Sequence, residues 1–80
     1  MDRVDARLRK VFGDLFRIDP TSITDDMRRG EMDGWDSLAH LDLVSQLESE
    51  FGVSIDTEQA LEIETFADAR RLLETRPADA

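Results

Sequence analysis

Apolar residues recur at helical spacing in four segments of the chain, and no segment alternates long enough to predict a strand. The first segment covers residues 2–16 and ends ahead of Pro20, because proline disfavours helical geometry in the residue before it. Its apolar positions are Val4, Leu8, Val11, Phe12 and Leu15. Charged residues occupy the other faces, so the pattern predicts an amphipathic helix over residues 2–16.

A connection follows over residues 18–36, and it is longer than most links between helices. A connection of this length is expected to pack on the core or to serve a function. Its apolar residues, which can hold it against the core, are Ile23, Met27, Met32 and Trp35. We expect Trp35 to anchor the loop beside the next helix, with contact to a ligand as the alternative, and residues 24–27 to form a short helical turn.

The second predicted helix covers residues 37–51. Its expected buried stripe is Leu38, Leu41, Val44, Leu47 and Phe51, with Leu43 beside it. Either Asp36 or Ser37 can cap the first turn by accepting a hydrogen bond from a free backbone N–H. Gly52 tolerates the left-handed geometry that often ends a helix. Both ends of this helix are therefore marked in the sequence.

Two shorter helices complete the predicted fold, which is an all-α, small four-helix bundle with a long loop between its first two helices. The segment Asp56-Thr57-Glu58-Gln59 resembles a capping box and predicts a short third helix through Ile63. Thr65 is expected to cap the fourth, whose inward-facing residues are Phe66, Ala69, Leu72 and Leu73. We expect residues 1–75 to form one domain and residues 76–80 to form a flexible tail.

The composition excludes several classes of protein. An 80-residue chain is near the lower size limit for independent folding and leaves little room for a deep catalytic cavity. It has no cysteine, so neither disulfides nor thiolate metal sites can hold it together. Its apolar runs are far shorter than the roughly 20 residues of a membrane span, and the first residues do not resemble a secretory signal. We therefore expect a monomeric, cytoplasmic protein.

The charge is unevenly distributed along the chain. The formal net charge is −9, which disfavours nucleic acid and anionic membranes as partners. Between Gly30 and Ala69 there is no Lys or Arg. The same stretch holds eleven acidic residues: Glu31, Asp33, Asp36, Asp42, Glu48, Glu50, Asp56, Glu58, Glu62, Glu64 and Asp68. This stretch forms either an ordinary solvated surface or a docking surface for basic partners.

The candidate catalytic residues do not form a known constellation. Ser37 and His40 are neighbours on a helix, but the Gly-x-Ser-x-Gly turn of a serine hydrolase is absent. A single histidine without cysteine makes a zinc site improbable. We therefore expect no enzymatic activity. His40 is expected to be a solvated surface residue, with a partner contact as the alternative.

The segment Gly34-Trp35-Asp36-Ser37-Leu38 and the acidic helix that ends in Leu47-Glu48-Ser49-Glu50-Phe51-Gly52-Val53 resemble the signature of the acyl carrier protein family. The resemblance extends over nearly the whole order of predicted helices and loops. It implies that 4′-phosphopantetheine, donated by coenzyme A through a separate magnesium-dependent phosphopantetheinyl transferase, is esterified to Ser37. The terminal thiol of this arm would then carry acyl groups as thioesters.

The same resemblance implies roles for the neighbours of Ser37. Asp36 and Leu38 would be recognised by the transferase. Acyl-loading and acyl-processing enzymes with basic patches would dock on Leu38, Leu41, Asp42, Glu48 and Glu50. Ala39, His40 and Ser49 depart from the pattern of fatty-acid carriers, which favours a carrier of polyketide-type or related secondary metabolism.

Two alternatives to this interpretation stay open. Gly34-Trp35 points to acyl cargo, because peptidyl or aminoacyl carriers serving an adenylating enzyme more often have Gly-Gly at this place. A peptidyl carrier is therefore the second interpretation within the same fold. An acidic helical interaction domain without a cofactor is the alternative from another class, and in it Ser37 would serve only as a helix cap.

Overall fold

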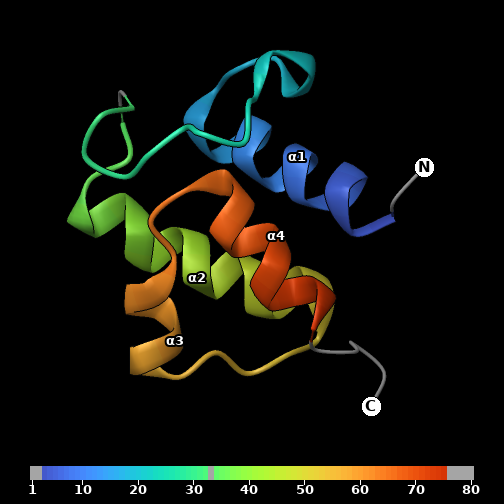
Figure 1. The fold of residues 1–80 in the computed structure, drawn as a ribbon, viewed down its shortest axis with the longest axis vertical. Helices are drawn as coiled ribbons and strands as arrows, with labels where there is room; N and C mark the ends of the chain where they lie inside the picture. The colour runs from blue at the N-terminus through green and yellow to red at the C-terminus, as the bar shows by residue number, and fades with distance from the viewer. Residues whose placement is uncertain (1–2, 33, 76–80) are drawn as a thin grey trace.

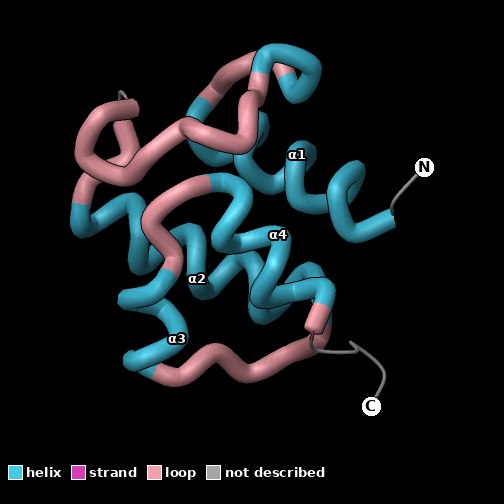
Figure 2. The backbone as a smooth tube through the Cα atoms, in the orientation of Figure 1, coloured by secondary structure: helices cyan, strands magenta, loops and turns pink. Residues whose placement is uncertain are grey.

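The structure is a computed structural model that describes residues 3–32 and 34–75. Its elements, in chain order, are α1 (Arg3–Phe16), the 3₁₀ turn η1 (Pro20–Ser22), α2 (Ser37–Phe51), α3 (Thr57–Glu62) and α4 (Phe66–Glu74). Figures 1 and 2 show the helices packed into a bundle, with the long α1–α2 loop folded over one end of it. The all-α prediction is confirmed. No helix among these described residues has the length and apolarity needed to cross a membrane.

The predicted caps are present at the helix ends. The Asp36 carboxylate accepts a hydrogen bond from the Ala39 N–H at 2.9 Å, and Gly52 ends α2 with a φ of 65°. Capping boxes open α3 at Asp56 and α4 at Thr65. Because a cap depends on residues within one helical turn, the sequence was sufficient to predict α2 with its observed bounds.

The prediction for residues 24–27 was wrong. This segment is a single turn closed by the Met27 N–H on the Thr24 carbonyl at 3.2 Å, and the helical turn of the loop lies earlier, at η1. Pro20 opens η1, where its fixed φ suits a helical turn and its missing N–H costs nothing. Asp19 caps the same turn by accepting the Thr21 N–H at 2.9 Å. The tail predicted at residues 76–80 lies outside the described residues.

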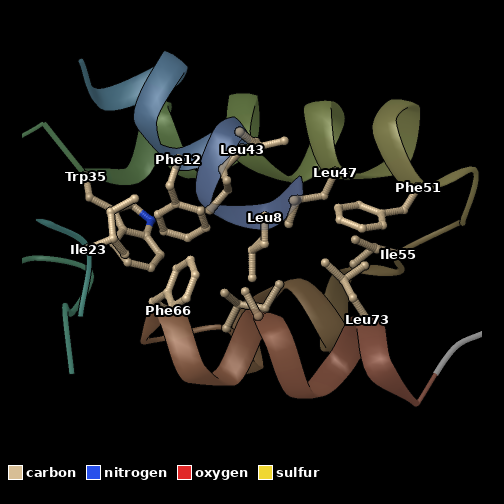
Figure 3. Packing of buried hydrophobic residues seen from close by; sticks show 13 residues of the cluster. Leu8, Phe12, Ile23, Trp35, Leu43, Leu47, Phe51, Ile55, Phe66 and Leu73 are labelled. Carbon is tan, nitrogen blue, oxygen red and sulfur yellow. The ribbon is translucent and has the colours of Figure 1, made fainter. Parts of the chain in front are cut away.

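The hydrophobic core lies between α1, α2 and α4. Its largest fully buried side chains are Trp35, Phe12, Phe66, Leu8, Leu43, Leu47 and Ile63. Figure 3 shows the aromatic end of this core, where Phe12 lies beside Phe66 and Trp35. The ring centroid of Phe12 is 4.9 Å from that of Phe66 and 5.2 Å from that of Trp35, both in edge-to-face geometry. Trp35 is therefore the loop anchor that its position predicted.

The predicted buried stripe of α2 was partly wrong. The buried residues of α2 are His40, Leu43, Leu47 and Phe51. Leu38 and Leu41 are 76% and 67% exposed. Apolar residues occur around most of this helix, so their spacing fits more than one stripe. The packing of α1 on α2, which periodicity within α2 does not reveal, decides which stripe is buried.

The long loop is held by backbone hydrogen bonds to the segment that opens α4. The Arg29 N–H donates to the Glu64 carbonyl at 2.7 Å, and the Phe66 N–H donates to the Met27 carbonyl at 3.0 Å. The Ala67 N–H donates to the Asp25 carbonyl at 3.2 Å. These bonds fix residues 25–29 of the loop against the start of α4.

A network of ion pairs ties the same loop to α1 and α4. Arg70 donates to both carboxylate oxygens of Asp25 at 2.8 Å and to Asp5 at 3.0 Å. Arg9 also pairs with Asp5, at 2.7 Å, and donates to the Ile23 carbonyl at 2.7 Å. The hydrogen bonds from Arg70 lower the pKa of the Asp25 carboxyl below its usual value. This shift favours the charged form of Asp25 in the folded protein.

Candidate functional site

Ser37 is the first residue of α2, and its side chain is exposed. The N-terminus of a helix presents backbone N–H groups without intrahelical partners, and the helix dipole favours negative charge there. A phosphate group on the Ser37 hydroxyl would therefore be placed in a favourable field. Because the hydroxyl is exposed, a modifying enzyme can reach it without unfolding α2.

The two neighbours of Ser37 are exposed as well, but they differ in what they contact. Asp36 is occupied in capping α2, since its carboxylate accepts the Ala39 N–H and its carbonyl accepts the His40 N–H, both at 2.9 Å. Leu38 is 76% exposed, which leaves an apolar side chain in water beside the serine. The two predicted recognition residues, Asp36 and Leu38, thus lie on the surface on either side of Ser37.

His40 is a buried residue, so its prediction as a solvated or partner-contacting side chain was wrong. It is 6% exposed, and its Nδ1 accepts a hydrogen bond from the indole N–H of Trp35 at 3.0 Å. Indole nitrogen can only donate, so the proton of the neutral imidazole is on Nε2. The Nε2–H then donates to the Ala60 carbonyl at 2.8 Å. His40, three residues after Ser37, therefore links the loop, α2 and α3.

A sequence signal for this role exists. His40 precedes Leu43 by three residues and Leu47 by seven, so it continues the helical stripe that the structure shows to be buried. A polar residue in such a stripe requires hydrogen-bond partners inside the protein. Trp35, five residues earlier, supplies one of them. Sequence reasoning missed the pair because the wrong stripe was chosen.

An open groove of about 470 Å³ lies beside Ser37. Its lining residues are Arg29 from the loop, Ser37, His40 and Leu41 from α2, and Leu61 from α3. A second groove of about 280 Å³ runs between α2 and α3 and shares His40, Leu41 and Leu61 with the first. A flexible arm attached to Ser37 therefore has an open path along the surface. The residues that line these two grooves fit a phosphopantetheine arm on Ser37.

The predicted docking residues divide into two groups. Leu38, Leu41 and Asp42 are exposed and lie at helical spacing on one face of α2. Glu48 instead accepts the Ile55 N–H at 2.7 Å, and Glu50 pairs with Arg7 at 3.1 Å. Glu48 therefore stabilises the fold as well as adding negative charge to the surface. The exposed Glu50–Arg7 pair contributes little to stability, so Glu50 acts mainly through its charge.

Metal binding receives no support from the described part of the chain. Within residues 3–32 and 34–75, no three His, Cys, Asp or Glu side chains are grouped in a way that could hold a metal ion. The chemistry offered by the site is therefore that of an exposed hydroxyl beside an open groove, on a surface rich in carboxylates.

Comparison with known proteins agrees with this geometry. Residues 6–73 match the family model described as phosphopantetheine attachment site. An acyl carrier protein of Treponema pallidum (strain Nichols) is 35% identical over 77 residues, which cover 95% of this chain and 97% of that protein. An acyl carrier protein of Cylindrotheca sp. (strain N1) is 31% identical over 70 residues, which cover 88% of each chain.

Proposed function

This chain belongs to the acyl carrier protein family, and from that membership we propose that it holds biosynthetic intermediates as thioesters on an arm attached to Ser37. The cofactor of the family is covalently attached 4′-phosphopantetheine. Its thiol supplies the acyl-bearing group that a chain without cysteine lacks. The protein itself would deliver the intermediates and catalyse no step.

One observation carries the assignment of the attachment site. Ser37 is exposed at the head of α2, directly after the Asp36 cap, and it opens on the groove that Leu41 and Leu61 line. In our proposal Asp36 and Leu38 are recognised by the phosphopantetheinyl transferase. Asp36 would do so through its fixed capping position, since its own charge opposes that of the phosphate.

Partner enzymes are proposed to dock on the exposed face of α2. Leu38 and Leu41 would supply apolar contacts, and Asp42 would supply a free carboxylate for a basic patch. Glu48 and Glu50 would contribute mainly through the field that they add to this face. We propose that the protein acts as a monomer, because this face has to be accessible to several enzymes in turn. We also propose that it acts in the cytoplasm.

For the pathway, we propose polyketide-type or related secondary metabolism, with a peptidyl or aminoacyl carrier as the alternative. Ala39 and Ser49 support this choice, since both replace acidic residues that are frequent in fatty-acid carriers. His40 no longer contributes to it, because its hydrogen bonds to Trp35 and Ala60 account for its presence. Loading assays with acyl and aminoacyl substrates would separate the two kinds of carrier.

The attachment site is tested by mass spectrometry of the intact protein. Incubation with coenzyme A, magnesium and a promiscuous phosphopantetheinyl transferase should add one arm to the wild type and none to Ser37→Ala. Ser45→Ala changes another exposed serine of α2 and should be modified like the wild type. An unchanged wild-type mass, or equal modification of Ser37→Ala, would overturn the proposal.

A carrier must also be distinguished from an acidic interaction domain without a cofactor. A carrier delivers cargo through its arm, so turnover by a partner enzyme should require the modified form. An interaction domain should support its partner equally well in both forms. The comparison of modified and unmodified protein in one assay decides between them.

A further inference from the structure

Arg29 is held close to the attachment serine by two backbone contacts. Its own N–H donates to the Glu64 carbonyl at 2.7 Å, and the N–H of the next residue, Gly30, donates to the Trp35 carbonyl at 3.1 Å. Trp35 lies two residues before Ser37 in the sequence. The backbone at Arg29 is therefore fixed both to the segment that opens α4 and to the loop end that leads into α2.

The Arg29 side chain is half-buried and lines the same groove as Ser37. Among the described residues, its guanidinium donates one hydrogen bond, to the Leu61 carbonyl at 3.5 Å, which is long for such a bond. No carboxylate among the described residues lies within ion-pair distance of it. The adjacent Arg28 differs, because it pairs with Glu64 at 3.0 Å. Arg29 thus retains N–H donors for a further acceptor.

The phosphodiester that joins the arm to Ser37 would bring a negative charge into this groove. Among the described residues that line it, Arg29 is the one cation. A guanidinium binds phosphate oxygens through two parallel hydrogen bonds, and the pairing strengthens where the site is partly shielded from water. We propose that Arg29 binds the phosphodiester of the modified protein and fixes the first atoms of the arm.

This inference rests on the proposed attachment at Ser37 and gives the groove a specific role. An arm held at its phosphate would run from Ser37 across the surface of Leu41 and Leu61. Its distal part would stay free to reach partner enzymes. It also explains how a phosphate is accommodated beside the like-charged Asp36. The positive charge comes from the loop, since the stretch after Gly30 has no cation until Arg70.

The experiment compares Arg29→Gln with the wild type, each in the modified and unmodified form, and uses Arg28→Gln as the matched control. Modification should raise the melting temperature of both proteins, and the gain should be about 1–5 °C larger for the wild type than for Arg29→Gln. This difference is the size expected for one partly exposed ion pair. The ³¹P resonance of the diester should also shift between the wild type and Arg29→Gln. Arg28→Gln should behave like the wild type in both measurements.

The outcomes separate this inference from the proposed function. If the wild type takes up no arm, the attachment at Ser37 is wrong. If all proteins are modified but the ³¹P shift and the thermal gain are unchanged in Arg29→Gln, only the role of Arg29 is wrong. Should Arg29→Gln fail to fold, Arg29→Lys replaces it. This variant keeps the charge but loses the second parallel hydrogen bond, so a ³¹P resonance identical to that of the wild type would overturn the inference.

Discussion

The indole N–H of Trp35 donates a hydrogen bond to Nδ1 of His40 over 3.0 Å, and both side chains are almost completely buried. The two aromatic rings are also stacked, with a centroid distance of 6.1 Å. Trp35 precedes the Asp36 cap, and His40 lies in the first turns of α2. The two residues therefore lie on either side of Ser37 in the sequence. The start of α2, where Ser37 lies, is thus held by a polar contact within an apolar core.

Replacement of His40 by leucine should destabilise the protein. His40→Leu leaves the Trp35 N–H buried without a partner, which costs about 1–3 kcal/mol. It also removes one of the two hydrogen bonds to the Ala60 carbonyl, worth about 0.5–1.5 kcal/mol, while the bond from the Ile63 N–H stays. Part of this loss is offset by the apolar leucine side chain, so we expect a net loss of about 1–3 kcal/mol in the free energy of unfolding. Trp35 is the single tryptophan, so its fluorescence during urea denaturation measures the loss directly.

The matched control for this change is Gln46→Leu, an exposed position of the same helix. It adds the same side chain without removing a buried hydrogen bond, and its stability should stay close to that of the wild type. Equal stabilities of His40→Leu and Gln46→Leu would show that the Trp35–His40 contact contributes nothing.

The ion pair between Arg70 and Asp25 makes stability depend on pH in a defined direction. The guanidinium lowers the pKa of the Asp25 carboxyl in the folded state, whereas an unfolded Asp has a pKa of about 3.9. The stabilisation is therefore complete above that value and is lost as pH falls through the lower folded-state pKa. Solvent screening limits this pair to about 1 kcal/mol or less, because the Asp25 side chain is 58% exposed. Arg70→Gln should therefore lower the melting temperature at pH 7 by at most about 4–8 °C, and by less at pH 2.5.

Lys10→Gln is the control for Arg70→Gln, because Lys10 and Asp14 form an exposed ion pair on α1. Pairs of this kind contribute little to stability, so this variant should unfold like the wild type at both pH values. If Arg70→Gln lowers the melting temperature by the same amount at pH 7 and at pH 2.5, the role assigned to Asp25 is contradicted.

Gly13→Ala should destabilise the protein even though alanine favours helices more than glycine does. A Cβ atom at this buried position of α1 would lie 2.9 Å from the Ile18 carbonyl oxygen and 3.1 Å from Pro20 Cγ. The backbone of the loop would have to move, which typically costs about 1–3 kcal/mol. Thermal unfolding measures this cost, and Ser45→Ala, on the exposed side of α2, serves as the stability-neutral reference. A Gly13→Ala protein more stable than the wild type would show that the loop yields freely.

Charge changes on α2 should separate docking from folding. Asp42 is exposed and has no ion pair among the described residues, so Asp42→Lys should slow association with an acyl-processing partner enzyme several-fold while leaving the melting temperature unchanged. Glu48→Lys should instead lower the melting temperature, since it removes the acceptor of the Ile55 N–H. Stopped-flow association rates at low and high salt measure the first effect, because salt screens exposed charges beyond about 10 Å. Unchanged rates for Asp42→Lys at low salt would remove Asp42 from the docking face.

The sequence was most informative where structure depends on neighbouring residues. Asp36 and Gly52 marked the two ends of α2 because a cap requires only the backbone of one helical turn. The capping boxes at Asp56 and Thr65 located α3 and α4 for the same reason. The exposed position of Ser37 follows directly from these signals, so this part of the candidate site was predictable.

Features that depend on distant residues were not predictable in the same way. The burial of His40 requires Trp35 and Ala60, which lie on other elements and approach only in the folded chain. The groove beside Ser37 likewise needs Arg29 and Leu61, and nothing in the local pattern relates these two residues. Periodicity identifies the faces of a helix, but the rest of the fold decides which face is covered.

The pairing of the long loop with the segment before α4 has a consequence for the order of folding. Arg28 and Glu64, which meet there, are 36 residues apart in the sequence. Contacts between distant residues form more slowly than helical turns, so α2 is expected to form before the loop reaches its final structure. On the ribosome, the loop could be completed only after the start of α4 had emerged. The surroundings of Ser37 would therefore mature late, although the residue lies near the middle of the chain.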